Sequence, residues 1–302
     1  MTSNARSWFL NPSFVFACIT IVAIVVCAIA APLLAPVGPN IQLSQGLTTG
    51  GMPLPPSWTH WFGTDVLGRS VVSRILYGAR ATLIVGVVSN VAAVIIGTAV
   101  GVLAGMFDGW RRGILMRFVD MMLAYPPLLI AIAIAAIVGP SMWIATLVIA
   151  LSNWTWIARV VYTKTLSLRE RNFIIASEML GGSKTWVTLK HMIGHVAPIM
   201  VIWGTLGVAI TVQLSAALSF LGVGVQPPTA SWGNIIYQNE SYFTVAPWLV
   251  FIPGAFVLLL SLAFNIAGEH LQEWFEVSEE RFEASADDEG TAYARSGDAT
   301  GP

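Results

Sequence analysis

The stretch YTKTLSLRERNFIIASEMLGGSKTWVTLKHMIGHVAP (residues 162–198) is the longest polar, basic interruption in an otherwise apolar chain. Apolar residues still recur within it at helical spacing: Phe173, Ala176, Leu180, Trp186, Leu189 and Ile193. A pattern of this kind predicts short helices that bury one face against a neighbour. The spacing therefore indicates a segment that docks against another surface.

The composition places the chain in a lipid bilayer. It has 302 residues, of which 56% are hydrophobic and 10% are charged, and its mean hydropathy is +0.73. Soluble domains usually hold about 25% charged and about 45–50% apolar residues. The chain is therefore an integral membrane protein, and the even spread of its apolar runs predicts one bundled domain of the all-α class.

Six apolar runs are long enough to cross a membrane. They cover residues 14–31, 81–107, 118–138, 143–161, 199–221 and 247–267. The first run could also be a cleaved secretory signal, but its length of about eighteen residues favours an uncleaved helix. We divide the chain into an N-terminal part (1–80), a core (81–275) containing the 162–198 loop, and an acidic tail (276–302). The tail is too poor in apolar residues to fold, so we expect it to be disordered.

The N-terminal part ends in a second amphipathic pattern. Leu67, Val71 and Ile75 recur at four-residue spacing, with Arg69 and Arg74 beside them. Apolar residues on one face and arginines nearby predict a helix that lies at the membrane interface and leads into the second span.

Three glycines, an aspartate and two prolines stand out in the second and third runs. Gly97, Gly101 and Gly105 form a ridge that allows close helix packing, and pore lining or contact with a homologous subunit remains the alternative. Asp120 lies within a turn of Arg117 near the membrane surface, where we expect an interfacial ion pair. The pair at 126–127, both prolines, predicts a kink in the third span.

The basic residues indicate the orientation of the chain. Placing both termini in the cytoplasm leaves three basic residues outside, namely Arg69, Arg74 and Arg80. Twelve then lie inside: Arg6, Arg111, Arg112, Arg117, Arg159, Lys164, Arg169, Arg171, Lys184, Lys190, Arg281 and Arg295. This bias follows the positive-inside rule, so we expect the 162–198 loop to be cytoplasmic.

No catalytic or ligand-binding constellation accompanies this loop. The segment GGSKT (181–185) lacks a glycine directly before its lysine, because Ser183 intervenes, so it is not a phosphate loop. His191 and His195 are four residues apart, but no zincin glutamate accompanies them, so a metal site is disfavoured. A basic and aromatic surface for nucleic acid is also missing. We therefore expect neither a cofactor nor catalysis in this chain, and what remains for the loop is a mechanical role.

The loop itself predicts a mechanical element. Residues 173–180 can form two helical turns, Gly181 can end them in a left-handed cap, and Ser183 can cap a second helix. A short helix held crosswise by two flanking spans would act as a rigid lever. The alternative is an amphipathic loop that lies on the lipid surface, which would explain the basic residues equally well.

Three ordered motifs resemble one transporter family. The run of Ile175, Ala176 and Ser177, followed after three residues by Gly181, resembles the cytoplasmic "EAA" loop of ABC importer permeases. The segments HWFGTDVLGR (60–69) and LSFLGVGVQPPTASWGN (218–234) resemble the C-type permease subunit of dipeptide and oligopeptide ABC importers. The similarity covers residues 11–274. It departs from the pattern at Ile175 in place of an acid, Ser177 in place of alanine, and Gly194 in place of proline.

The resemblance implies the type I ABC importer permease fold, with six transmembrane helices and a cytoplasmic coupling helix in a bacterial or archaeal cell (inner) membrane. It implies a heterodimer with a homologous B-type permease, two cytoplasmic ATP-binding subunits and an extracytoplasmic substrate-binding protein. The residues that would couple this chain to the ATPase are Ile175, Ala176, Ser177, Leu180, Gly181, Gly182 and Ser183.

The family implies a dipeptide or oligopeptide as the substrate, with a nickel complex or an oligosaccharide as alternatives for the same permease type. An ion-coupled secondary transporter is the competing class. It would ordinarily need ionisable side chains at mid-membrane, and apart from Asp120 near one end the predicted spans contain none.

Overall fold

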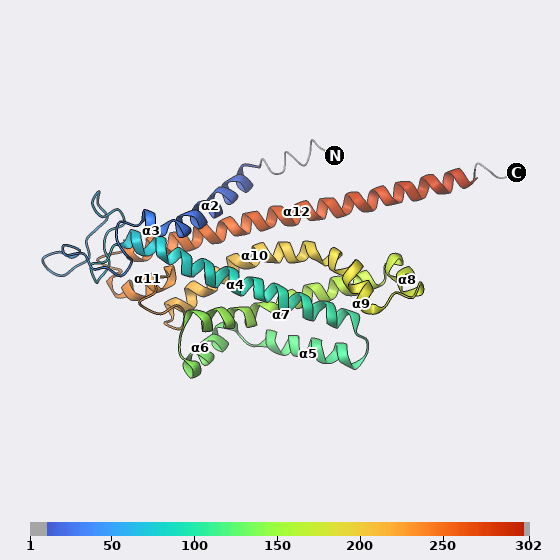
Figure 1. The fold of residues 1–302 in the computed structure, drawn as a ribbon, viewed down its shortest axis with the longest axis horizontal. Helices are drawn as coiled ribbons and strands as arrows, with labels where there is room; N and C mark the ends of the chain where they lie inside the picture. The colour runs from blue at the N-terminus through green and yellow to red at the C-terminus, as the bar shows by residue number, and fades with distance from the viewer. Residues whose placement is uncertain (1–10, 299–302) are drawn as a thin grey trace.

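Long helices run side by side along the molecule (Figure 1). The computed structural model describes the backbone of residues 11–298 and the side chains of residues 11–277. Within these residues, five helices are long and apolar enough to span a membrane, and a bent pair raises the number to six if it forms one span. The five contain α2 (Pro12–Ile29), α4 (Val71–Met106), α7 (Met142–Arg169), α10 (Ile193–Phe220), which continues the helix from Lys184, and α12 (Trp248–Asp298), of which the part up to Val277 counts as the span. The all-α class predicted from the sequence is confirmed.

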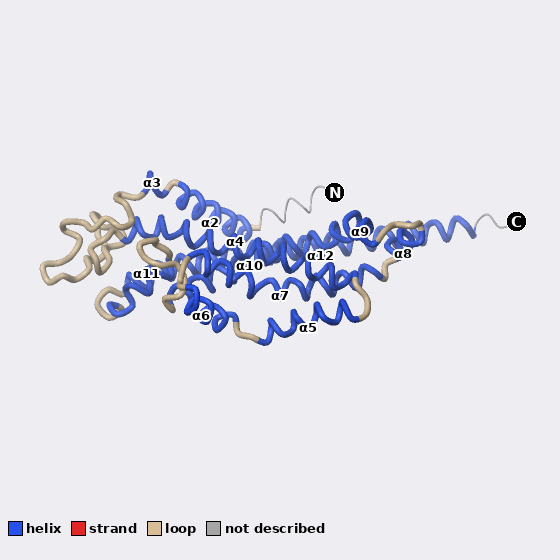
Figure 2. Tube along the Cα trace, turned by 60° about the horizontal axis from the view of Figure 1, so that its bottom comes forward, coloured by secondary structure: helices blue, strands red, loops and turns tan. Residues whose placement is uncertain are grey.

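Short elements gather at the two ends of the bundle. At one end, the α8 end, lie α8 (Asn172–Met179), α9 (Lys184–Val187) and the π-helix η1 (Thr188–Met192). At the other, the α11 end, lie α3 (Ala31–Leu34), α11 (Trp232–Asn239), the 3-10 helix η2 (Glu240–Tyr242) and the 35–70 loop. Figures 1 and 2 both show this separation, so the two sets of loops are joined through the long helices alone.

The glycine ridge lies against α7. A Cβ atom added at Gly97 would be 2.6 Å from the carbonyl oxygen of Trp154, and one at Gly101 would be 2.6 Å from that of Ala158. These distances are too short for any side chain, so glycine is required for α4 and α7 to approach this closely. The ridge therefore serves packing within this chain, and the alternative of a pore or subunit contact is not needed to explain it.

The third span is broken where the sequence predicted a kink. It consists of α5 (Trp110–Ala124) and α6 (Pro127–Val138), whose axes differ by 84°. Pro126 has extended backbone angles, and neither it nor Pro127 can donate a backbone hydrogen bond to the preceding turn. Two consecutive prolines thus separate the segment into two helices, and Figure 2 shows both at the edge of the bundle.

The interfacial helix expected after residue 65 is not formed. α4 begins at Val71, with Ser70 as its N-cap, and residues 65–69 form a tight turn in which Gly68 has a φ of 70°. The arginines beside this turn are buried in an ion-pair cluster described below, so they do not lie at a lipid surface. α4 also runs without a break through residue 80, so the expected boundary between the N-terminal part and the core falls inside a helix.

The last helix is longer than expected. α12 continues to Asp298 and projects past the α8 end of the bundle (Figure 1). The expected disordered tail is therefore helical as far as Asp298, and residues 299–302 lie outside the described part. The segment is rich in alanine and glutamate, which favour helices even where they bury little surface.

Candidate coupling site

The predicted lever has the predicted caps. α8 ends at Met179, Gly181 follows with a φ of 91°, and the amide of Gly182 donates to the carbonyl of Ser177 at 3.0 Å. The hydroxyl of Ser183 then accepts a hydrogen bond from the amide of Trp186 at 3.2 Å, which starts α9. The structure thus brings the sequence-predicted residues into one compact helix–turn–helix, with Ile175, Ala176 and Ser177 inside α8.

One face of this element is left open. Leu180 is 89% exposed and Met179 is 83% exposed, and Ile175 and Ala176 are also exposed. The opposite face is anchored, because Ile174 is 1% exposed. Large apolar side chains that are exposed next to one another form a patch, so the face is a candidate protein contact.

The inner face joins the main core. Ile174, Val187 and Met192 belong to one buried cluster with Val102 and Met106 of α4. Since these residues come from α8, α9, η1 and α4, a displacement of α8 must be transmitted to the long helices.

Aromatic rings surround the two histidines of the loop. The ring centroid of Phe173 is 5.3 Å from that of His195, and the centroid of Trp186 is 5.3 Å from that of His191. His191 lies within η1, a π-helical turn, which is a rare form often found at functional sites. The histidines therefore act here as packing groups that fix the direction in which α10 leaves the loop.

An acidic residue that sequence reasoning did not single out holds the base of the lever. Asp108, in the turn between α4 and α5, accepts two hydrogen bonds from Arg169 at 3.0 and 3.1 Å and lies 3.6 Å from Lys184. Arg169 also donates to the carbonyl of Gly105 at 3.0 Å. Hydrogen bonding from Arg169, followed by the charges of Arg169 and Lys184, lowers the pKa of Asp108 below its ordinary value. We call the ion pairs of Asp108 with Arg169 and Lys184 the Asp108 clasp. Arg112, four residues further on, also lies 3.8 Å from Asp108, but Arg169 and Lys184 are far away in sequence, so spacing could not have revealed their contacts with it.

Asp120 pairs differently from the sequence expectation. Its carboxylate lies 3.2 Å from the guanidinium of Arg159 on α7, and the expected partner was Arg117. Both partners of the observed pair are about half exposed, so the pair links α5 to α7 across the surface of the bundle.

Known proteins share this arrangement. The family described as "Binding-protein-dependent transport system inner membrane component" matches residues 97–277, which include the whole 162–198 loop. The chain belongs to this family. It is accordingly a multi-pass membrane subunit that transports and does not catalyse, and the family works with a partner permease, ATP-binding subunits and a substrate-binding protein.

Individual relatives extend the match beyond the core of the permease. The Dipeptide transport system permease protein DppC of Alkalihalophilus pseudofirmus is 38% identical, over 84% of this chain and 82% of that protein. The Glutathione transport system permease protein GsiD of Pectobacterium atrosepticum is 34% identical, over 72% of each chain. A solved chain of the MetNI methionine ABC transporter, in an inward-facing conformation, superposes with a TM-score of 0.56 at 20% identity. It covers 66% of this permease and 95% of the solved chain. The ABC importer permease fold is thereby shown, and the secondary-transporter alternative is set aside.

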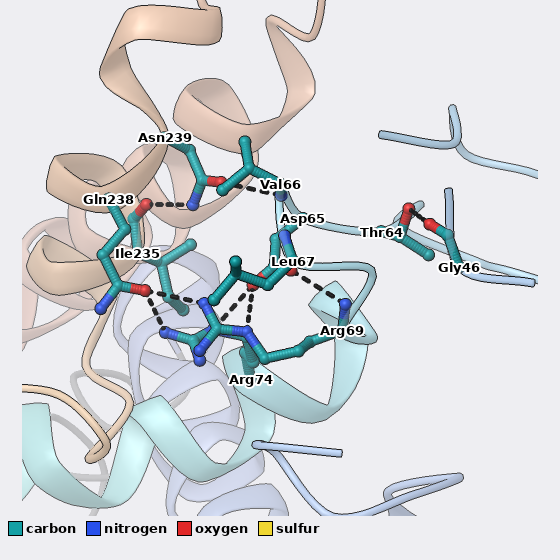
Figure 3. Close-up of polar contacts among 10 residues, drawn as sticks. All are labelled: Gly46, Thr64, Asp65, Val66, Leu67, Arg69, Arg74, Ile235, Gln238 and Asn239. Atoms are coloured by element: carbon teal, nitrogen blue, oxygen red, sulfur yellow. Dashed lines mark hydrogen bonds and ion pairs between the residues drawn. The ribbon is translucent and has the colours of Figure 1, made fainter. Parts of the chain in front are cut away.

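At its α11 end, the permease contains a buried charge cluster (Figure 3). Asp65 is 0% exposed and accepts from the side chain of Arg69 at 2.6 Å, and the guanidinium of Arg74 lies 3.6 Å away. Both arginines donate to the side-chain oxygen of Gln238 on α11, at 2.8 and 3.0 Å. The carboxylate also accepts from the amides of the 65–69 turn, so one residue fixes the loop, α4 and α11 together.

Proposed function

We propose that this permease forms half of the translocation pore of an ATP-driven importer of dipeptides or oligopeptides, paired with a homologous B-type permease. Two ATP-binding subunits in the cytoplasm would grip the coupling loops, and an extracytoplasmic substrate-binding protein would deliver the peptide. The peptide class is supported by relatives named for dipeptide and glutathione transport. The bias of basic residues supports cytoplasmic N- and C-termini, although Arg6 lies outside the described residues.

The observation that carries the coupling role is the exposed apolar face at Met179 and Leu180. It is held rigidly on two caps and one buried face, and it lies at the end of the bundle that the charge bias assigns to the cytoplasm. Closure of the ATPases on ATP would push α8 and α9, and the core cluster would pass the displacement to α4, α7 and α10. The two halves of the pore would then rock as rigid bodies between inward-open and outward-open states.

The docking proposal is tested by truncating the most exposed side chain of the lever. Burial of a leucine contributes about 1.5–3 kcal/mol, and Leu180→Ala removes most of that side chain. We expect the affinity of the purified permease pair for its ATPase subunits to fall about 10- to 30-fold, at about 1.4 kcal/mol per factor of ten.

Ile137→Ala is the matched control, because Ile137 is 85% exposed but lies on α6, toward the α11 end. Equal affinity of the Leu180 variant and the control would exclude docking through Leu180.

The substrate class is tested separately. Proteoliposomes containing the four membrane and ATPase subunits, supplied with the binding protein, are expected to accumulate a labelled dipeptide only with ATP. Accumulation of a nickel complex or an oligosaccharide in place of the dipeptide would overturn the peptide assignment and leave the coupling proposal intact.

A further inference from the structure

One polar side chain lies well inside the spanning helix α10 and has no hydrogen-bond partner among the described residues. Gln213 is seven residues from Phe220 at the α11 end of the helix and twenty from Ile193 at the other. At 1.5 Å per residue, these separations are about 10 Å and about 30 Å. Its side chain is exposed and forms no hydrogen bond within the described part of the chain.

Many polar side chains near Gln213 have hydrogen-bond partners within the described part of the chain, whereas Asn90 Oδ1, Thr98 Oγ1 and Asn153 Nδ2 are buried without one. The amide of Asn90 donates to the carbonyls of Trp203 and Gly204 at 3.2 and 2.9 Å, which ties α4 to α10. Several hydroxyl groups of the spanning helices donate to backbone carbonyls: Ser89, Thr146, Ser152, Thr155, Thr205, Thr211 and Ser261. Gln213 differs from the hydrogen-bonded residues in its lack of a partner, and from the buried atoms without a partner in its exposure.

A lipid-facing position would be costly for this side chain. An amide without a hydrogen-bond partner in hydrocarbon costs several kcal/mol, or about 4–8 kcal/mol on a cyclohexane scale. The side chain cannot reach the nearer membrane surface, because helical side chains tilt toward the N-terminus, and for α10 this points Gln213 deeper into the bilayer. The face around Gln213 therefore does not contact lipid.

We infer that Gln213 lines the water-filled translocation path and forms a hydrogen bond with peptide groups of the substrate. This inference rests on the proposed function. An amide side chain has both donors and an acceptor, so it complements a peptide group from either direction. It is also neutral, so it does not select substrates by the charge of their side chains.

Exposed apolar side chains lie near Gln213 on α10, and they favour weak binding of a transported molecule over tight binding. Ile210 and Phe220 flank it along the helix, and they are 47% and 43% exposed. One polar contact in an otherwise apolar wall gives weak binding, and a transported molecule must bind weakly enough to leave.

Cysteine accessibility tests the position of the side chain. In a background with Cys18 and Cys27 replaced by alanine, Gln213→Cys is compared with Val22→Cys in membranes containing the assembled transporter. Val22 is a matched control, because it is 60% exposed, lies on α2, and is also seven residues from the α11 end of its helix. A charged, membrane-impermeant methanethiosulfonate is applied with and without ATP and vanadate.

We expect the cysteine at 213 to react at least about tenfold faster than that at 22 in one of the two states, since a thiol in apolar surroundings ionises poorly. The rate should also differ between the states, because the path opens to opposite sides. Equal rates at 213 and 22 in both states would show that lipid or the partner permease covers this face, and would overturn the inference.

Substitution tests the peptide contact. Gln213→Leu should lower ATP-dependent dipeptide uptake, whereas Gln213→Asn should retain most of it. Unchanged uptake by Gln213→Leu would overturn the contact. If instead the wild-type complex fails to take up peptides, the proposed substrate fails, and the cysteine rates at 213 still report whether the path is there.

Discussion

Replacing Gly101 with alanine should force α4 and α7 apart. The added Cβ would lie 2.6 Å from the carbonyl oxygen of Ala158 and 2.8 Å from the Cβ of Val161. Ordinary contacts begin near 3.4 Å, so the helices must separate locally by about 0.8 Å, the difference between 3.4 and 2.6. Neither obstacle is the flexible end of a side chain. Overpacking of this kind costs about 1–3 kcal/mol.

Thermal unfolding of the purified permease in detergent measures this cost, with Trp154 of α7 as a nearby fluorophore. Gly204→Ala on α10 is the matched control, because no atom lies within 4 Å of its added Cβ. Alanine there should be neutral or stabilise the helix by about 0.5–1 kcal/mol. If the Gly101 variant unfolds at the same temperature as the Gly204 variant, the close approach of α4 and α7 is not what holds the core together.

Three further predictions concern charge. Asp65→Asn should destabilise the fold by about 3–5 kcal/mol, because two buried guanidinium groups lose their carboxylate. Asp120→Asn should cost at most about 1 kcal/mol, since its pair is exposed, and equal melting temperatures of the two variants would contradict this account. Asp108→Asn should lower the ratio of stimulated to basal ATP hydrolysis by up to about fivefold, because the base of the lever is loosened. The pKa of Asp108 is lower in the folded state than its ordinary value of about 4. The ion pairs of the clasp are therefore complete above that ordinary value and weaken only as the pH falls through the lower folded pKa. The ratio of stimulated to basal ATP hydrolysis of the wild-type complex should accordingly not decline between about pH 8 and pH 5 through this group.

Local chemistry made the helix–turn–helix formed by α8 and α9 predictable. A glycine at 181 and a serine at 183 specify where one helix ends and the next begins, and this signal needs no knowledge of the rest of the fold. The spanning helices could also be predicted, because the length of an apolar run identifies a helix that can cross a membrane.

The contacts between distant residues were not predictable in this way. Asp65 forms a tight turn with Arg69 and reaches Arg74 one helical turn further on, so a charge pattern typical of an interfacial helix in fact belongs to a buried cluster. Asp108 and Asp120 each find an arginine on α7, which sequence spacing cannot indicate. The prolines at 126 and 127 marked the position of the break, but its angle depends on how α5 and α6 pack against α7.

The π-turn η1 makes the direction of the exposed face of α8 depend on the number of residues in this loop. A residue contributes about 100° of rotation to an α-helix, so removing one residue from 188–192 and restoring α-helical bonds would turn α8 and α9 about the axis of α10 by about that angle. Leu180 would then point away from its present direction although every side chain of the lever was kept. Loops exchanged between permeases of this family should therefore be matched first in their number of residues between Gly181 and Ile193, and only then in sequence.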